Sequence, residues 1–214
     1  KGIDILRLDT FTKEFMQLSP EEFVLNIVKN YNAKGVVVGF NYRFGYKNLG
    51  DVELLKELSK KYDFQLFVVN PIKYKKEIVS SSNIRHIISD TGDMDKARAM
   101  LTRPFSLSGM VIKGRQIGRV IGFPTINLDY NKEFVIPRGG VYFTIVKYNG
   151  NYFKGVTNVG YNPTVENEKL SIETHILNFN KEIYDEKIRL YFISRIRDEK
   201  KFKSLDELSE RIKK

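Results

Sequence analysis

Hydrophobic and polar positions in the first hundred residues alternate between the spacing of strands and that of helices. The stretch IDILRLD (3–9) indicates a strand, and Ser19 followed by Pro-Glu-Glu is typical of a capped helix start. GVVVGF (35–40) indicates a buried parallel strand and FQLFVV (64–69) a third strand, with a helix capped by Asp51 between them. This order predicts a doubly wound α/β layer, in which ligands bind at the carboxyl ends of the strands.

The pattern changes near Pro104, where short and closely spaced strand patterns begin. Asn149 and Gly150 separate two alternating runs, GVYFTIVKY and NYFKGVTNV, and predict a hairpin because both central residues of a type I′ turn need positive φ. Further strands are indicated by LSIETHIL and KIRLYFI, and Ser204 can cap a closing amphipathic helix. These elements predict a small antiparallel β-barrel with a C-terminal helix. The predicted domains are 1–103 and 104–214.

Composition limits the classes of protein to which this chain can belong. It has no cysteine, which excludes disulfides, Cys-ligated zinc, iron–sulfur clusters and thiol catalysis. No apolar run is long enough to span a membrane and no signal-peptide pattern is found, so we predict a cytoplasmic protein without a membrane partner. The net charge of +10 favours anionic partners such as nucleic acid, acidic lipid or nucleotide phosphates, although a solvated lysine-rich surface explains it equally well.

A glycine-rich stretch, GRQIGRVIGFPTINL, is the first candidate for phosphate chemistry, because the chain contains no G-x-x-x-x-G-K-[S/T] and no G-x-G-x-x-G motif. Gly114, Gly118 and Gly122 indicate a flexible loop whose backbone N–H groups, with Arg115 and Arg119, can close over a triphosphate. A glycine-rich corner of the barrel is an equally good interpretation of this segment alone.

Oxygen ligands for a metal follow this loop. The two histidines, His86 and His175, are far apart in sequence, which disfavours a histidine-rich metal site. Thr125 and Asn127 project from one face if this stretch is a strand, and their oxygens suit Mg²⁺, which keeps several waters and needs few protein ligands. A Thr-x-Asn pair is otherwise a common surface alternation.

Glu173 is the candidate base for a phosphoryl acceptor. In SIETHIL it alternates with Ile172, Thr174 and Ile176 and therefore faces away from them. A carboxylate that accepts a hydroxyl proton is what a small-molecule kinase needs beside its Mg·ATP. Taken alone, a glutamate on the polar face of a strand is more often a solvated residue.

Several stretches together resemble a known family. GRQIGRVIGFPTIN, GVY, NVGYNPT, IETHILNF and IRDEKKF, in this order over 104–214, are similar to the riboflavin kinase module of the prokaryotic bifunctional riboflavin kinase/FAD synthetase. GFNYRFGYKNLGD and VSSSNIR resemble the family's adenylyltransferase half. The resemblance implies a partial, nucleotidyltransferase-like (Rossmann-like) α/β domain for FMN adenylylation, followed by a six-stranded antiparallel barrel that phosphorylates riboflavin with Mg·ATP.

The resemblance also implies roles for residues of the kinase half. Thr125 and Asn127 would hold Mg²⁺ and phosphate, and Glu173 would be the catalytic base. Arg197 and Phe202 fall in the segment expected to close over the flavin. The residues expected to cover the ATP are Gly114, Arg115, Gly118, Arg119, Gly122 and Phe123.

In the first half, the resemblance implies two sets of FMN- and ATP-binding residues. One follows a strand end, where Phe44 or Tyr42 could stack on a flavin, although without the resemblance both would be assigned to the core. The other leads into a helix near Asn83, where serines and an arginine would bind phosphate, or would simply cap the helix. The two sets are Gly39, Asn41, Arg43, Phe44, Gly45 and Asp51, and Ser80, Ser81, Ser82 and Arg85.

The chain departs from the family pattern in three ways. Asn41 replaces the usual aspartate and Ser82 the usual threonine, and the family's H-x-G-H-type turn is not found between Lys1 and these motifs. We therefore expect a shortened form of a longer protein that phosphorylates riboflavin without making FAD. Its expected partners are riboflavin, FMN and ATP, with no nucleic acid; the alternative is a basic small-barrel protein that binds nucleic acid.

Overall fold

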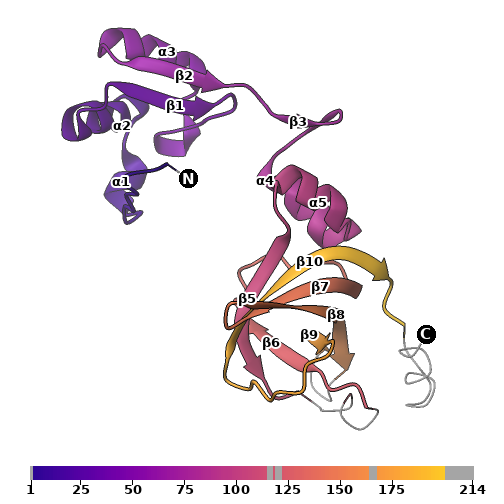
Figure 1. Ribbon diagram of the computed structural model, residues 1–214. Helices are drawn as coiled ribbons and strands as arrows, with labels where there is room; N and C mark the ends of the chain where they lie inside the picture. Colours follow the sequence, from indigo (N-terminus) through magenta and orange to yellow (C-terminus); the bar gives the residue numbers. More distant parts are fainter. Residues whose placement is uncertain (1, 115–117, 119–121, 164–167, 201–214) are drawn as a thin grey trace. The chain divides into compact units, whose positions relative to one another are not determined.

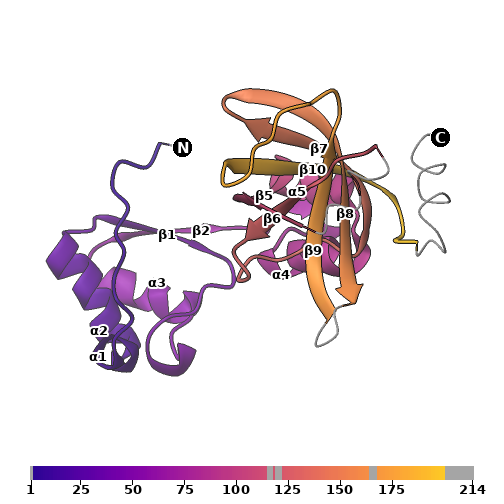
Figure 2. The ribbon, with the colours of Figure 1, turned by 90° about the horizontal axis from the view of Figure 1, so that it is seen from below.

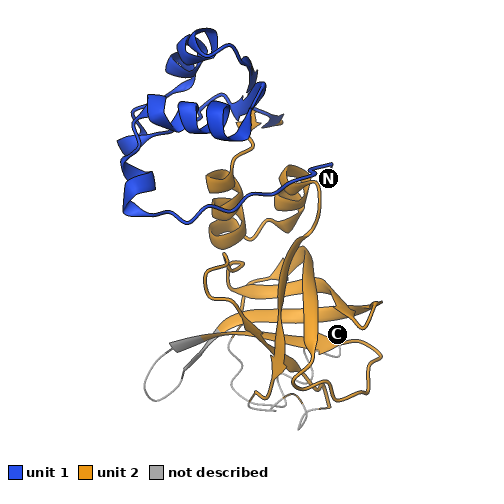
Figure 3. Cartoon of the chain, turned by 90° about the vertical axis from the view of Figure 1, so that its left-hand side faces the viewer, with its two compact units in different colours: residues 1–73 blue, residues 74–214 orange. Residues whose placement is uncertain are grey.

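The computed structural model describes residues 2–114, 118, 122–163 and 168–200. The chain forms two compact units, 1–73 and 74–214 (Figure 3). The division falls earlier than the predicted domain boundary at 103/104, because helical residues before the barrel share its hydrophobic core. The barrel strands themselves begin at Phe105, next to the predicted position.

The first unit contains a parallel strand pair and helices with the predicted caps. The Ser19 side chain and Glu22 form a capping box, and Asp51 accepts a hydrogen bond from Leu54 N at 3.0 Å as the cap of the following helix. Both caps confirm the sequence prediction. The elements are α1 (Lys13–Gln17), α2 (Pro20–Leu25), η1 (Asn26–Asn30), β1 (Gly35–Gly39), η2 (Tyr46–Asn48), α3 (Val52–Lys61) and β2 (Gln65–Val69), with β1 and β2 parallel.

Two predictions for this unit are wrong. Residues 3–9 form no strand, and Ile5 and Leu8 are 84% and 86% exposed. A strand needs a neighbour for its N–H and C=O groups, and none of the described strands pairs with this stretch. β1 is parallel as predicted but is not buried on both faces, since Val38 packs against the helical core with Leu55 while Val37 is 68% exposed.

The second unit is a closed antiparallel barrel preceded by helices (Figures 1 and 2). Its strands follow the order β10-β5-β6-β9-β8-β7, which confirms the six-stranded barrel. Asn149 and Gly150, with φ of 48° and 78°, form the predicted hairpin turn. The predicted helix after Ser204 lies outside the described residues. The elements are β3 (Lys73–Tyr74), β4 (Glu77–Ile78), α4 (Ser81–His86), η3 (Ile87–Thr91), α5 (Met94–Leu101), β5 (Phe105–Ile112), β6 (Ile126–Tyr130), β7 (Gly140–Tyr148), β8 (Asn151–Pro163), β9 (Glu168–Ile176) and β10 (Lys187–Arg197).

Side chains fill the interior of the barrel. Apolar residues of all six strands form one cluster with the buried face of α5, which closes one end of the core. Within this cluster three buried threonines form a hydrogen-bonded row, in which Thr157 Oγ1 lies 2.8 Å from both Thr144 Oγ1 and Thr174 Oγ1. The buried hydroxyls therefore have hydrogen-bond partners inside the barrel.

Replacing Phe192 with alanine is expected to destabilise the barrel strongly. Phe192 is fully buried, and its ring lies 5.4 Å from that of Tyr142 and 5.9 Å from that of Phe105. Loss of the ring should lower the free energy of unfolding by about 3–5 kcal/mol, which urea denaturation followed by circular dichroism would measure. Phe134→Ala, at a ring that is 56% exposed, is the control and should change it by no more than about 0.5 kcal/mol.

Candidate active site

Asn127 and Glu173 face each other across neighbouring strands. In the antiparallel pair of β6 and β9, Asn127 lies directly opposite Glu173 and Ile126 opposite Thr174. Thr174 and Ile172 are 1% exposed inside the barrel, so Glu173 points to the outer face, as predicted. Opposite residues share one face with Cβ atoms about 5 Å apart. The register thus places the candidate base beside the candidate metal ligand.

Thr125 immediately precedes β6, in a turn that β9 holds in place. His175 Nδ1 lies 2.8 Å from the Pro124 carbonyl oxygen, and its ring packs edge-on against Phe123 at 5.6 Å. Because a carbonyl oxygen only accepts hydrogen bonds, Nδ1 carries the proton in this contact. His175 therefore positions the turn that carries Thr125. Sequence reasoning missed this role, although the alternation along β9 places His175 on the same face as Glu173.

Gly114, the first residue of the glycine-rich stretch, lies against the side chain of Asn127. A Cβ atom on Gly114 would stand 2.0 Å from Asn127 Nδ2, so only glycine allows this approach. The contact leaves Asn127 only 9% exposed. Gly118 accepts a hydrogen bond from Phe123 N at 2.7 Å, and Gly122 has a φ of 84°. The other two predicted residues of this loop, Arg115 and Arg119, lie outside the described residues.

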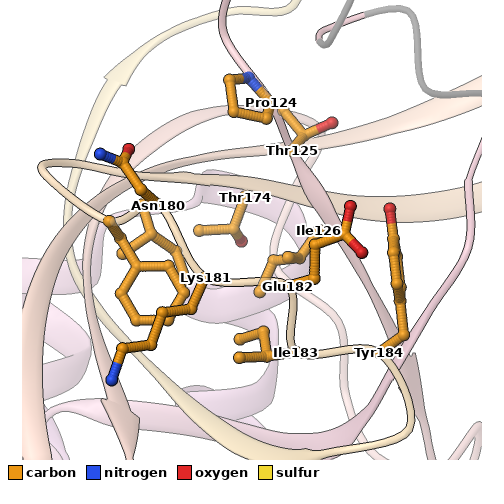
Figure 4. Close-up of a pocket in the computed structure, with 11 residues that line it drawn as sticks. Pro124, Thr125, Ile126, Thr174, Asn180, Lys181, Glu182, Ile183 and Tyr184 are labelled. Atoms are coloured by element: carbon orange, nitrogen blue, oxygen red, sulfur yellow. The ribbon is translucent and has the colours of Figure 1, made fainter.

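A cavity of about 240 Å³ opens beside Thr125 (Figure 4). Its walls come from the start of β6, from β9 and from the segment that joins β9 to β10. Apolar side chains form much of the lining, with polar groups among them. The joining segment contains no motif by which sequence reasoning could have found it. The lining residues from that segment are Phe179, Asn180, Lys181, Glu182, Ile183 and Tyr184.

A row of paired residues runs from Glu173 around the outer face to Arg197. Glu173 is opposite Asn158 of β8, Asn158 is opposite Val141 of β7, and Val141 is opposite Arg197 of β10. Arg197 Nη1 donates to the Asp198 carbonyl oxygen at 3.2 Å. The predicted flavin residue Arg197 thus lies on the same row as the candidate base, whereas Phe202 lies outside the described residues.

Arg195 fixes the chain where it leaves β10. Its Nη2 donates to the Gly139 carbonyl oxygen at 2.7 Å and to Asp198 Oδ1 at 2.6 Å. The hydrogen bond from Arg195 lowers the pKa of Asp198, so this carboxyl group is ionised at neutral pH. We call this arrangement of Arg195, Gly139 and Asp198 the β10 clamp.

The predicted adenylyltransferase residues of the first unit have structural partners. Gly39 ends β1, and Asn41 lies in the turn that follows. Arg43 Nη1 lies 3.4 Å from Asp51 Oδ2, in an exposed ion pair, while Asp51 also caps α3. Gly45 has a φ of 71°. A ligand role for these residues stays a prediction.

Phe44 is a core residue in this unit. It is 4% exposed, with its ring 5.6 Å from that of Tyr42 in a stacked arrangement and 5.7 Å from that of Phe23. Burial also raises the pKa of the half-buried Tyr42. The expectation that Phe44 offers a stacking surface to a flavin is therefore not met, because its ring is already covered by side chains.

The second set of predicted adenylyltransferase residues, which contains three serines and Arg85, lies in α4 and its N-cap, in the second unit. Ser80 accepts a hydrogen bond from Asn83 N at 3.2 Å and is the N-cap, and Ser81 and Ser82 form the first turn. Arg85 is exposed in the last turn. The capping interpretation is confirmed, and phosphate binding at this helix stays a prediction.

Comparisons with family models and with known sequences agree on the family. The family model described as Riboflavin kinase matches residues 101–214, and the one described as FAD synthetase matches 1–83. "Bifunctional riboflavin kinase/FMN adenylyltransferase" proteins from Buchnera aphidicola and Listeria monocytogenes are 37% and 36% identical, over 99% and 100% of this chain and 69% and 68% of their own length. A crystal structure described as a macrolide-efflux protein from Streptococcus pneumoniae matches with a TM-score of 0.86 and 35% identity, over 95% of this chain and 65% of that chain.

The barrel and its family match define a flavin-modifying transferase. The chain belongs to the bifunctional riboflavin kinase/FMN adenylyltransferase family, and its function lies in flavin cofactor biosynthesis. It spans about two thirds of the length of the relatives it matches. The matches give no support to the alternative of a nucleic-acid-binding barrel. Among the described residues, no helix is long and apolar enough to cross a membrane.

Proposed function

We propose that the barrel unit transfers the γ-phosphoryl group of ATP to the terminal ribityl hydroxyl of riboflavin, giving FMN and ADP. The observation that carries this proposal is the register of β6 and β9, which pairs Asn127 with Glu173 on the outer face. A proton acceptor and an oxygen ligand for a metal–phosphate group need to be neighbours for in-line phosphoryl transfer. The family match to riboflavin kinase supplies the identity of the acceptor.

The positions of the cavity and of the residue row suggest that ATP and riboflavin approach the Asn127–Glu173 pair from opposite sides. Thr125 lines the cavity and lies two residues before Asn127, so a nucleotide base in the cavity would extend its phosphates past Thr125 towards Asn127. The flavin would then approach Glu173 from the other side, over Asn158 towards Arg197. Gly114, which lies against Asn127, would be next to the phosphates.

The oxygen atoms of Thr125 and Asn127 fit a magnesium ion. A hydroxyl and a carboxamide oxygen are hard, neutral donors, and Mg²⁺ commonly binds few protein ligands together with substrate phosphates and water. The ion would neutralise charge on the phosphates as the bond to the leaving ADP breaks. Described residues provide no cluster of three or more His, Asp or Glu, so this donor set is the one we assign to the metal.

Glu173 would act as the general base. Its carboxylate would accept the proton of the ribityl hydroxyl while that oxygen forms its bond to the γ-phosphorus and the bond between this phosphorus and the bridging oxygen of ADP breaks. Glu173 is half-buried and has Ser171 Oγ 3.5 Å from its Oε1, on the same face of β9. His175 would keep the Thr125 turn in register with this base.

We further infer that FMN adenylylation, the second activity in the names of the relatives, belongs to the part of the family protein that includes the first unit. The match of the FAD synthetase model to residues 1–83 supports this assignment. Its candidate FMN- and ATP-binding residues are those of the two sets that begin at Gly39 and Ser80, except Phe44, whose ring lies in the core. A cysteine-free chain that uses ATP is also in keeping with the cytoplasmic location that we propose.

Incubating the purified chain with riboflavin, ATP and magnesium chloride tests the proposal. Chromatography that separates riboflavin, FMN and FAD should show FMN accumulating. Formation should stop when EDTA removes the metal and should resume when excess magnesium is added, because the phosphates need a divalent cation. A chain that binds neither flavin nor nucleotide and forms no FMN would contradict the proposed kinase activity.

A further inference from the structure

The segment after β10 brings a second carboxylate onto the face that carries Glu173. Glu199 Oε1 lies 2.0 Å, and Asn158 Nδ2 3.0 Å, from the point at which a Cβ atom on Gly160 would stand. The carboxylate therefore occupies the space that a side chain at position 160 would fill. This approach requires glycine there, because any larger residue would displace Glu199.

The β10 clamp explains why Glu199 lies at this place. Arg195 holds Asp198, the residue before Glu199, through the 2.6 Å contact, and Arg197 Nη1 donates to the Asp198 carbonyl oxygen. Both views of the ribbon show the described end of the chain beside β8 (Figures 1 and 2), in agreement with the contact between Glu199 and Gly160. The residue before Glu199 is thus held by Arg195, whose side chain is 18% exposed.

The Glu199 carboxylate lies beside Gly160 of β8, and the residue opposite Gly160 on β9 is two positions away from the candidate base Glu173. Gly160 is opposite Ser171, and Asn158 is opposite Glu173, in the pairing of β8 with β9. Residues two apart on a strand share a face and are separated by about 7 Å. Two carboxylates therefore follow one another along this face, which disfavours a polyphosphate there and suits an uncharged chain of hydroxyl groups.

We propose that Glu199 accepts hydrogen bonds from the inner hydroxyls of the ribityl chain of riboflavin and positions the terminal hydroxyl at Glu173. The inference rests on the proposed kinase function and names a specificity residue for it. A carboxylate accepts hydrogen bonds only, and hydroxyl groups are the donors that a ribityl chain offers. Such charge-assisted bonds are stronger than neutral ones and fix orientation.

Glu199→Ala tests this proposal in the complete chain. We expect the KM for riboflavin to rise about tenfold and kcat to change less than about threefold, because the contact exists before and during phosphoryl transfer. Quenching of flavin fluorescence in the presence of Mg·ADP gives the binding readout. Affinity for riboflavin should fall about tenfold, while affinity for lumiflavin, the same ring system without the ribityl chain, should stay within about twofold.

Gly160→Ala is a second, independent variant, since its Cβ would take the place of the Glu199 carboxylate. It should reproduce the selective loss, and the double variant should be no worse than either single one, because both remove the same contact. Glu133→Gln, an exposed glutamate beyond the end of β6, is the control and should behave as the unaltered chain.

Three results would overturn the inference. Unchanged riboflavin affinity in Glu199→Ala would show that the carboxylate touches no part of the flavin. Equal losses for riboflavin and lumiflavin would mean that the residue only orders the chain after β10. Additive losses in the double variant would mean that the two residues act separately. A failure of the proposed kinase function would give a different result, because the unaltered chain would then form no FMN.

Discussion

Glu173→Gln is expected to lower the rate of FMN formation by about 10²–10⁴-fold with little change in the binding of riboflavin or nucleotide. Glutamine has nearly the same shape as glutamate but cannot take up the proton of the attacking hydroxyl. The position opposite Asn127 on the outer face of the barrel is the structural reason for choosing this residue. Initial rates of FMN formation, together with flavin fluorescence titrations, separate the loss of chemistry from a loss of binding.

Two further variants make the result specific to this carboxylate. Glu173→Asp keeps the proton acceptor at a shorter reach and should retain more activity than Glu173→Gln. Glu133→Gln changes the same chemical group at an exposed site and should leave turnover unchanged. FMN formation at the normal rate by Glu173→Gln would remove this residue from the mechanism and would leave the barrel without its assigned base.

Asn127→Leu is expected to give the second largest loss, about 10²-fold in kcat/KM for ATP, because its carboxamide oxygen is assigned to the metal and phosphate. Leucine keeps a similar volume under Gly114, where the asparagine is 9% exposed, so the barrel should remain folded. Rates measured as a function of magnesium concentration should show a requirement shifted to higher concentrations in this variant.

Asn127→Asp supplies the matched comparison, since it retains an oxygen ligand and should need less magnesium than the leucine variant. Asn151→Leu, at an exposed position where β8 begins, controls for the change from asparagine to leucine. An unaltered magnesium dependence in Asn127→Leu would show that the metal is bound elsewhere, and the assignment of Thr125 would then fail with it.

Local signals in the sequence predicted a feature correctly where the residues that form it lie within a few positions of one another in the chain. The capping residues Ser19 and Asp51 and the hairpin at Asn149 and Gly150 follow from bonds and dihedral angles within a few residues, and all are present in the structure. The alternation around Glu173 also gave its face correctly, because side chains of a strand alternate with a period of two. The family and the barrel followed from several such motifs in order.

Predictions that depended on distant neighbours succeeded less often. The alternating stretch 3–9 has the pattern of a strand, but no described strand pairs with it, and Val37 is exposed because the hydrophobic core lies on the other face of β1. Phe44 was expected at a flavin and lies in the core instead. In each case the pattern was compatible with the prediction, and the missing information was which other segment covers the residue.

The sequence by itself determined the barrel class, the family and the face on which Glu173 lies, because these depend on local periodicity and on motif order. Only the tertiary structure decided which residues meet. The register of β6, β9 and β8 places Glu173 between Asn127 and Asn158, and the chain after β10 brings Glu199 to Gly160. A strand register joins residues that are far apart in the chain. Closing the intervening loops lowers the conformational entropy of the chain, and only the packing of the whole barrel offsets this loss.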